Sequence, residues 1–326
     1  MKILVFEYIT GGGFNKQELP EALANEGRLM LQALLDGLRC CADINVTLML
    51  DERVNGSINT AGLDTVIIGP EQNSHEIFAD LARHCDALWP IAPEFDGILQ
   101  ALCHTAALSG KLLLTSPSDA VALTGDKWLT YLHLKQHGIA TVPTRLYTGI
   151  DQYGDGLWLV KPIDGAGCAD SYILTDRQHF EQMQPSPGRY IIQPHIAGKK
   201  TSLSCLFKQG RGWLLCANLQ QFSKSHRQYH LSEIIVNHQL DLSAYRDLVD
   251  TIAGALPELW GYAGIDLIET SDQRLVLEIN PRLTTSFAGI NAALGINVAG
   301  NVLQLLQGSP DLTAARNHPV TIKVSS

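Results

Sequence analysis

The sequence has no excess of basic residues and no long apolar run. Its 326 residues include 24 lysines and arginines against 33 aspartates and glutamates, a formal net charge of −9. A nucleic-acid surface needs a basic stripe, so we expect no nucleic-acid partner. No stretch reaches the ~20 apolar residues of a membrane span. Glu7 interrupts the short apolar run at the N-terminus, so we expect a core strand there, no signal peptide and no membrane contact.

Cysteine patterns and two common nucleotide signatures are also missing. The chain has seven scattered cysteines and no C-x-x-C pair, which excludes a disulfide framework and a zinc site of the usual spacing. Buried, reduced thiols in a cytoplasmic protein are the simplest interpretation. There is no G-x-x-x-x-G-K-[ST] loop, and the triplet Gly11–Gly13 does not match G-x-G-x-x-G. We therefore expect neither a Walker-type phosphate site nor a dinucleotide-binding oxidoreductase.

The order of apolar periodicities predicts an α/β chain of three domains, 1–115, 116–196 and 197–326. The first alternates short apolar runs with helical periodicity, which indicates a parallel sheet covered by helices. The second holds two short helices, closed by Gly138, and strands beside a glycine-rich turn. The third is strand-rich and ends in paired strands and a helix. Specific helices are expected over 18–39, 74–83, 97–108, 242–256 and about 298–307.

The stretch VLEINPRL places a carboxylate and an amide on one side of a strand. Strand side chains alternate, so Glu278 and Asn280 point one way while Ile279 points into the opposite core. Asp266 ends the preceding strand-like run, and an antiparallel hairpin would bring it beside the other two. Such hard oxygen donors suit Mg²⁺. The alternatives are a solvated edge strand and an Asp266 that only caps or pairs locally.

A Pro-Arg pair follows this strand. Pro281 ends the hydrogen-bonded ladder because it has no N–H to donate. Arg282 then sits just beyond the strand end, where a guanidinium can clamp a phosphate or a carboxylate through two parallel hydrogen bonds. An incidental surface arginine is the plainer alternative.

Two lysines suggest an anionic ligand. Lys161 ends an apolar strand and precedes Asp164-Gly165-Ala166-Gly167, a loop free to approach phosphates through its backbone. Lys127 opens a helix after Asp126, where the helix dipole disfavours a cation unless an anion lies at the same place. A plain turn and a solvated surface lysine are the structural alternatives.

The order of these elements resembles the ATP-grasp superfamily. The resemblance runs from residue 116 to the C-terminus and rests on Lys127, Lys161-Pro162, the glycine-rich loop, the strand end QPHIAG, Ser202, and Asp266 followed by Glu278-Ile279-Asn280-Pro281-Arg282. It implies an ATP-grasp fold, with a Rossmann-like first domain, a small α+β lid domain, and an α+β C-terminal domain carrying the magnesium site.

The resemblance also assigns roles to residues. Lys127, Lys161, the Gly165–Ala166–Gly167 loop, the hinge Gln193-Pro194-His195-Ile196 and Ser202 would bind ATP. Asp266, Glu278 and Asn280 would ligate Mg²⁺ or Mn²⁺. Lys161 and Arg282 would be catalytic, with Arg282 facing the acyl phosphate or the substrate carboxylate. In this chain the hinge has Gln193-Pro194-His195 where many relatives carry a ribose-binding acid.

Two further segments resemble a narrower group. FEYITGGG places Glu7 and Tyr8 at the end of the first strand, and APEFDGIL places Glu94 and Asp96 after a later one, where parallel strands form a ligand crevice. Together with EINPRL they resemble the tyramine–glutamate ligases of methanofuran-type cofactor biosynthesis. The resemblance implies that the γ-carboxylate of L-glutamate is joined to the amine of tyramine or a relative. A tight turn at Gly11–Gly13 and a helix cap at Glu94 are the alternatives.

Several interpretations remain open at this stage. An ATP-grasp kinase that phosphorylates a small molecule, or a nucleotide-binding protein without catalysis, shares most of these features. The expected partners are small carboxylate and amine substrates, and a homodimer is expected by family analogy alone. Ser232-Glu233 stands where related enzymes often have paired glycines. His226, Arg227 and His230 lie in a polar stretch that fits a solvated loop better than a substrate site.

Overall fold

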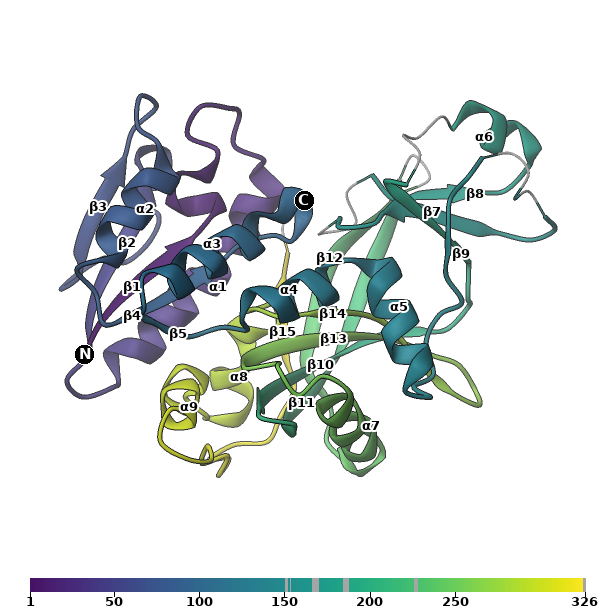
Figure 1. Ribbon diagram of the computed structural model, residues 1–326. Coiled ribbons are helices and arrows are strands. Elements are labelled where there is room, and N and C mark those ends of the chain that lie inside the picture. Colours follow the sequence, from purple (N-terminus) through teal and green to yellow (C-terminus); the bar gives the residue numbers. More distant parts are fainter. Residues whose placement is uncertain (150–151, 153, 166–169, 184–187, 226–227, 325–326) are drawn as a thin grey trace.

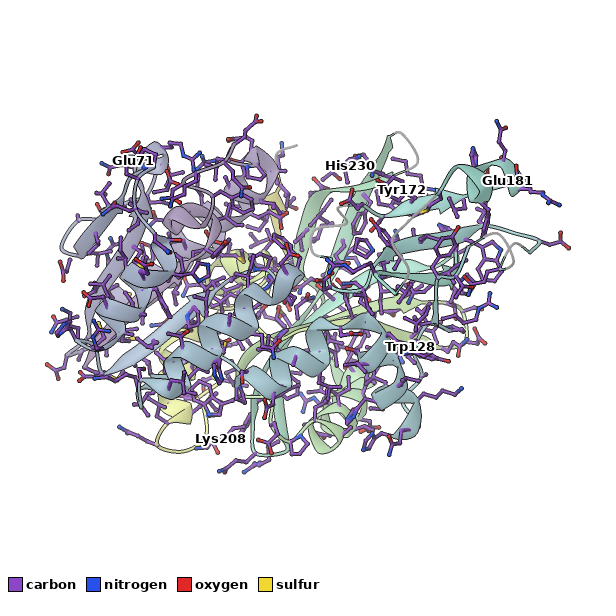
Figure 2. The ribbon with its side chains drawn as sticks, turned by 45° about the horizontal axis from the view of Figure 1, so that its top comes forward. Glu71, Trp128, Tyr172, Glu181, Lys208 and His230 are labelled. Carbon is purple, nitrogen blue, oxygen red and sulfur yellow. The ribbon has the colours of Figure 1, made fainter. Side chains whose placement is uncertain are left out.

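A computed structural model describes residues 1–149, 152, 154–165, 170–183, 188–225 and 228–324 (Figure 1). The described residues form three β-sheets, one of five strands, one of four and one of six. Side chains are drawn in Figure 2, where Tyr172 and Glu181 mark the four-stranded sheet and its helix, and His230 marks the six-stranded sheet. No helix among the described residues is long and apolar enough to cross a membrane.

The first sheet is parallel and covered by helices on both faces, as predicted. Its order is β3-β2-β1-β4-β5. Ile3 and Val5 pack into one core layer with α1, whereas Leu4 and Phe6 pack into another with α2 and α3. Burial on both faces explains why residues 3–6 of β1 are all apolar. The elements are β1 (Lys2–Glu7), α1 (Glu21–Arg39), β2 (Asn45–Asp51), β3 (Asp64–Ile68), α2 (Ser74–Ala82), β4 (Ala87–Ile91), α3 (Ile98–Leu108) and β5 (Leu112–Leu113).

The second sheet is small and antiparallel, with the order β6-β9-β7-β8. Two helices precede it, α4 (Ser118–Gly125) and α5 (Lys127–Gln136). Val160, Ile192 and Phe180 form its core. The elements are β6 (Arg145–Leu146), β7 (Trp158–Pro162), β8 (Tyr172–Leu174), α6 (Arg177–Gln182) and β9 (Tyr190–Pro194).

The third sheet has the order β14-β13-β10-β11-β12-β15 and is antiparallel throughout. One face packs on α7. The sequence reasoning missed α8 and β15, and it read the polar run of β12 as a loop. The elements are β10 (Lys199–Lys208), β11 (Arg211–Ser225), β12 (Gln228–Gln239), α7 (Ser243–Ala255), β13 (Gly261–Glu269), β14 (Arg274–Asn280), α8 (Phe287–Leu294), α9 (Val298–Leu305) and β15 (Val320–Lys323).

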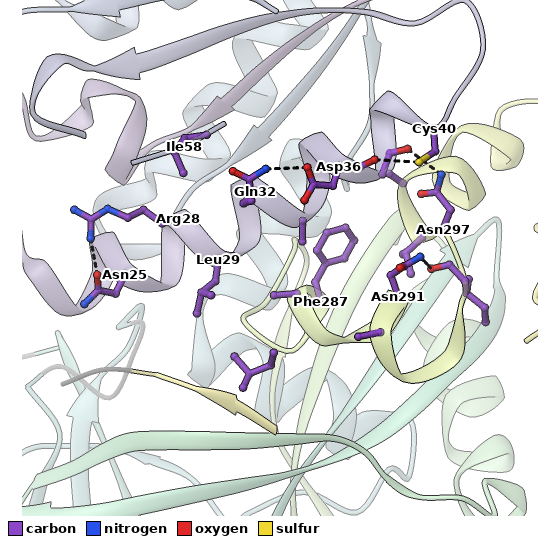
Figure 3. Close-up of a pocket in the computed structure, with 18 of the residues that line it drawn as sticks. Asn25, Arg28, Leu29, Gln32, Asp36, Cys40, Ile58, Phe287, Asn291 and Asn297 are labelled. Atoms are coloured by element: carbon purple, nitrogen blue, oxygen red, sulfur yellow. Dashed lines mark hydrogen bonds between the residues drawn. The ribbon is translucent and has the colours of Figure 1, made fainter. Parts of the chain in front are cut away.

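Helix α1 connects the first and third sheets. Its buried leucines share one core with Phe287, Ile290 and Val302 of α8 and α9. Beside this contact lies a cavity lined by Leu29 and Phe287 (Figure 3). Glu26, on the same helix, lines a different cavity described below. The domain boundaries near residues 115 and 196 stay predictions, although the strands of each sheet fall within one predicted interval.

Candidate active site

The β13–β14 hairpin brings the predicted oxygen donors together. Its register pairs Asp266 with Glu278 and Gly264 with Asn280, which confirms the predicted hairpin. Alternation sends Ile265 and Ile279 into the core against α7 and leaves the acidic side chains on the opposite face. Asn280 Nδ2 donates a hydrogen bond to Asp266 Oδ2 over 3.1 Å.

A glutamine from a neighbouring strand supports the same carboxylate. Gln220 Nε2 in β11 donates to Asp266 Oδ1 over 2.9 Å. Sequence reasoning missed Gln220, because its position depends on how β10, β11 and β13 lie side by side. Ser202 in β10 pairs directly with Asp266 in the strand register, and both residues line the cavity described below.

Two lysines from outside this sheet converge on Glu278. Asp126 caps α5, its Oδ1 accepting the N–H groups of Trp128 and Leu129 at 2.8 Å each, so Lys127 is the first helical residue, as predicted. Lys127 Nζ lies 3.4 Å from Glu278 Oε2 and donates to the carbonyl oxygen of Gly165 over 2.6 Å. Lys161, buried at the end of β7, has its Nζ 3.9 Å from the same oxygen.

The two carboxyl groups have opposite pKa shifts. Burial raises the pKa of Asp266 to about 8, and the negative charge of Glu278 adds to this rise. For Glu278 burial also acts upward, but Lys127 and Lys161 together outweigh it and lower the pKa to about 2. Of the two carboxyl groups, Glu278 is therefore the ionised one. Asp266 keeps its proton unless a cation enters the site beside it.

The chemistry of this donor set fits a hard divalent cation. Two carboxyl groups and an amide supply only oxygen ligands, once the Asn280 amide turns its oxygen inward. The described residues contain no group of three or more His, Cys, Asp or Glu side chains placed to hold a metal. A cation here would thus have two carboxylates and an amide from the protein and further oxygens from ligands or water, as Mg²⁺ accepts.

One cavity joins these groups. Its walls include both lysines and the three oxygen donors, together with apolar and polar side chains. The apolar and aromatic ones are Leu159, Phe222, Tyr229, Leu231, Ile234, Leu267 and Leu277, and the group of polar ones beside α1, called the polar end below, consists of Glu26, Arg282, Thr284, Thr285 and Ser286. Aromatic and apolar side chains beside cationic groups suit a nucleotide.

The predicted hinge borders this region without lining the cavity. Gln193 is buried and its Nε2 donates to Thr144 Oγ1 over 2.8 Å. The His195 N–H donates to the carbonyl oxygen of Leu157 over 2.8 Å, and the ring Nε2 bonds the Tyr229 hydroxyl over 2.6 Å. Pro194 continues β9 and Ile196 packs against an apolar cluster, so the role of these four residues stays a prediction.

The Arg282 guanidinium, which we expect to clamp a phosphate or a carboxylate of a ligand, pairs with a carboxylate of the protein. Its Nη2 forms an ion pair with Glu94 Oε2 at 2.8 Å, and Nη1 donates to the carbonyl oxygen of Leu283 over 3.1 Å. Glu94 stands at the N-cap position of the short 3-10 helix Phe95–Gly97, as the capping alternative has it, but its side chain makes no capping hydrogen bond and pairs with Arg282 instead. Arg282 lines the cavity, and its charged partner in the structure is Glu94.

Four of the residues named in the sequence analysis are outside the described residues: Ala166, Gly167, His226 and Arg227. His230 is half-buried in β12 rather than in a solvated loop, which corrects that interpretation.

Glu26 and Thr285 were also missed, although a signal existed for Glu26. It lies on the apolar stripe of the predicted helix, four residues before the buried Met30. A carboxylate on such a stripe is unusual and indicates a polar site.

Comparisons with known proteins give the following relatives. A family model described as an ATP-grasp domain matches residues 124–286, half of the chain, and one described as a pre ATP-grasp 3 domain matches residues 44–121. A tyramine–L-glutamate ligase from Methanocaldococcus jannaschii is 27% identical over 290 residues, which cover 88% of this chain and 84% of the relative. The ligase of the same name from Methanocaldococcus fervens is 25% identical over 290 residues, 88% of this chain and 89% of that protein.

A solved structure agrees with the fold. The crystal structure of an ATP-grasp superfamily protein from Archaeoglobus fulgidus is similar with a TM-score of 0.73 and 24% identity, covering 99% of this chain and 92% of that chain. At this identity the likeness shows the fold alone.

Proposed function

Because the chain belongs to the ATP-grasp family, we propose that it is an ATP-dependent carboxylate–amine ligase that joins L-glutamate to tyramine or a related amine. One observation carries the proposal: Lys127, Lys161, the Asp266–Glu278–Asn280 donors and Arg282 line a single cavity. The names of the two similar ligases support the choice of substrates.

The lysines bind the phosphates of ATP in this proposal. In the structure described here, Glu278 is a counter-ion that both ammonium groups share, so bound nucleotide would compete with it through its own negative charge. Asp266, Glu278 and Asn280 would hold Mg²⁺ or Mn²⁺, which supplies positive charge to the transferring phosphoryl group. Lys127 also donates to the carbonyl oxygen of Gly165 and thereby connects that residue to α5.

The reaction has two steps. An oxygen of the γ-carboxylate attacks the γ-phosphorus of ATP, ADP leaves, and an acyl phosphate results. The neutral amine then attacks the carbonyl carbon, the C–N bond forms, and inorganic phosphate leaves. Lys161 stabilises charge on the transferred group, and Arg282 orients the carboxylate at the polar end of the cavity. By resemblance we place the reaction in methanofuran-type cofactor biosynthesis, and a homodimer stays a prediction for sedimentation to check.

ADP release tests the proposal. The purified protein receives Mg-ATP and L-glutamate, with or without tyramine or another amine from a panel, and products are identified by mass spectrometry. We expect ADP release that depends on the amine and a new γ-glutamyl amide. A phosphorylated product without amide would overturn the ligase in favour of a kinase. Absence of turnover with every amine would overturn the proposed substrates.

A further inference from the structure

Three acidic side chains lie near the Arg282 guanidinium, and one of them, Glu26, lines the cavity with it. Glu94 contacts Arg282 directly at 2.8 Å. Glu26 on α1 accepts a hydrogen bond from the Thr285 hydroxyl. Glu7, at the end of β1, lies against Gly27, the residue after Glu26, since a Cβ added there would be 2.6 Å from its Oε2. Three distant segments of the chain thus bring their acids to one place.

The three carboxyl groups can carry more negative charge than the single positive charge of Arg282 balances. Burial raises the pKa of Glu26 and of Glu7, and in each case the charge of Arg282 opposes that rise without reversing it. Thr10 satisfies one oxygen of Glu7 through its N–H at 2.7 Å and its hydroxyl at 2.6 Å. One arginine stands near three carboxyl groups, two of them buried and Glu26 half-buried, so the site has room for another positive charge.

A buried acceptor in this cluster also lacks a donor. The Glu94 side chain is only 6% exposed, and its Oε1 has no hydrogen-bond partner among the described residues. Buried polar atoms are rarely left unpaired, so this oxygen marks the place of a missing N–H or O–H group.

We propose that Glu26 and Glu94, with Glu7 behind them, bind the primary ammonium group of a substrate. A primary ammonium offers three N–H donors and one positive charge, which the cluster lacks. Glu26 and Arg282 line the same cavity as Lys161 and Glu278, so a substrate held here has its other end near the phosphate groups. The inference rests on the proposed function and concerns its substrate L-glutamate, whose α-ammonium can be held here while its γ-carboxylate faces the phosphate groups. The amine of tyramine attacks the acyl phosphate as a neutral amine, so it is not the group bound at this site.

Matched ligands with and without the ammonium group test the site. Binding to the full chain is measured by titration calorimetry with Mg²⁺ and a non-hydrolysable ATP analogue. The probes are L-glutamate against glutarate, and tyramine against 4-ethylphenol. For L-glutamate against glutarate, we expect the wild type to prefer L-glutamate by about tenfold to a hundredfold. Glu26→Gln should bring that ratio close to one and leave the other pair unchanged.

Controls separate this inference from structural damage. Glu21→Gln changes an exposed acid at the start of the same helix and should keep the wild-type ratios. Glu26→Asp should restore part of the preference, and Glu94→Gln should reduce it in the same pair. In turnover, Glu26→Gln should raise the KM of the same substrate and leave the KM of ATP unchanged.

The outcomes distinguish the two proposals. A preference for L-glutamate over glutarate that Glu26→Gln and Glu94→Gln leave unchanged would overturn the ammonium site, even if the amide is made. A wild type that prefers L-glutamate through Glu26 but makes no amide would retain the site and overturn the ligase. A wild type that binds glutarate as tightly as L-glutamate would also overturn the site.

Discussion

Replacing Glu278 with glutamine removes the internal counter-ion of two lysines. At an effective dielectric constant of about 20, separations of 3.4 Å and 3.9 Å correspond to about 5 and about 4 kcal/mol of Coulomb attraction, offset in large part by desolvation of the carboxylate. Glu278→Gln keeps the size of the side chain and removes the negative charge with which an anionic ligand would compete at Lys127 and Lys161. It also removes one of two carboxylates from the predicted metal site.

Two opposite effects follow from this one change. Without divalent metal, ATP should bind to Glu278→Gln at least about tenfold more tightly than to the wild type, because it no longer competes with an internal carboxylate. With excess Mg²⁺, amine-dependent ADP release should fall by about a hundredfold or more, because charge on the transferring phosphoryl group loses its stabilisation. Calorimetry in EDTA measures the first effect and an ADP assay the second.

A distant glutamate provides the control. Glu258 is exposed beyond α7, and Glu258→Gln should change neither quantity. Retained turnover in Glu278→Gln would refute its assignment as a metal ligand. Weaker or unchanged ATP binding in EDTA would refute the idea that Glu278 competes with nucleotide for the lysines.

Three further changes have defined outcomes. Lys161→Met should raise the KM for ATP about tenfold and lower kcat; an unchanged ATP response would reject its phosphate role. Burial raises the pKa of Glu26 above its ordinary 4.5, so folding stability falls as pH rises through the folded pKa. Glu26→Gln should therefore match the wild-type Tm below pH 4.5 and exceed it by about 1–3 °C at alkaline pH, whereas a lower Tm there would contradict this. Gly27→Ala places a Cβ 2.6 Å from Glu7 Oε2 and should cost about 1–3 kcal/mol, seen as a lower Tm.

The regular parts of the fold were predictable from local patterns. Strand β1 is continuously apolar because both faces are covered, and the β13–β14 hairpin has alternating residues on either side of a short turn. Helix α8 gave no such signal. It is eight residues long, has no side-chain cap and contains Gly289, whose Cβ would lie 2.8 Å from Val236. Tertiary packing rather than helix propensity makes α8 helical, and a short stretch of sequence does not reveal tertiary contacts.

The candidate site was predictable to the extent that its residues stand out locally. Lys127 is a cation at a helix N-terminus, which predicts an anion nearby, and the structure supplies Glu278 as that anion. Gln220 and the Arg282–Glu94 pair depend on contacts between segments 46 and 188 residues apart, so no spacing rule finds them.

The central claim is that the carboxylate is activated by transfer of a phosphoryl group before the amine attacks. The most direct measurement uses L-glutamate labelled with ¹⁸O in its γ-carboxylate, together with Mg-ATP and tyramine, and analyses the inorganic phosphate by mass spectrometry. An acyl phosphate predicts that one labelled oxygen passes to phosphate for each amide formed. Amide formation with unlabelled phosphate, or label recovered in AMP, would contradict the account.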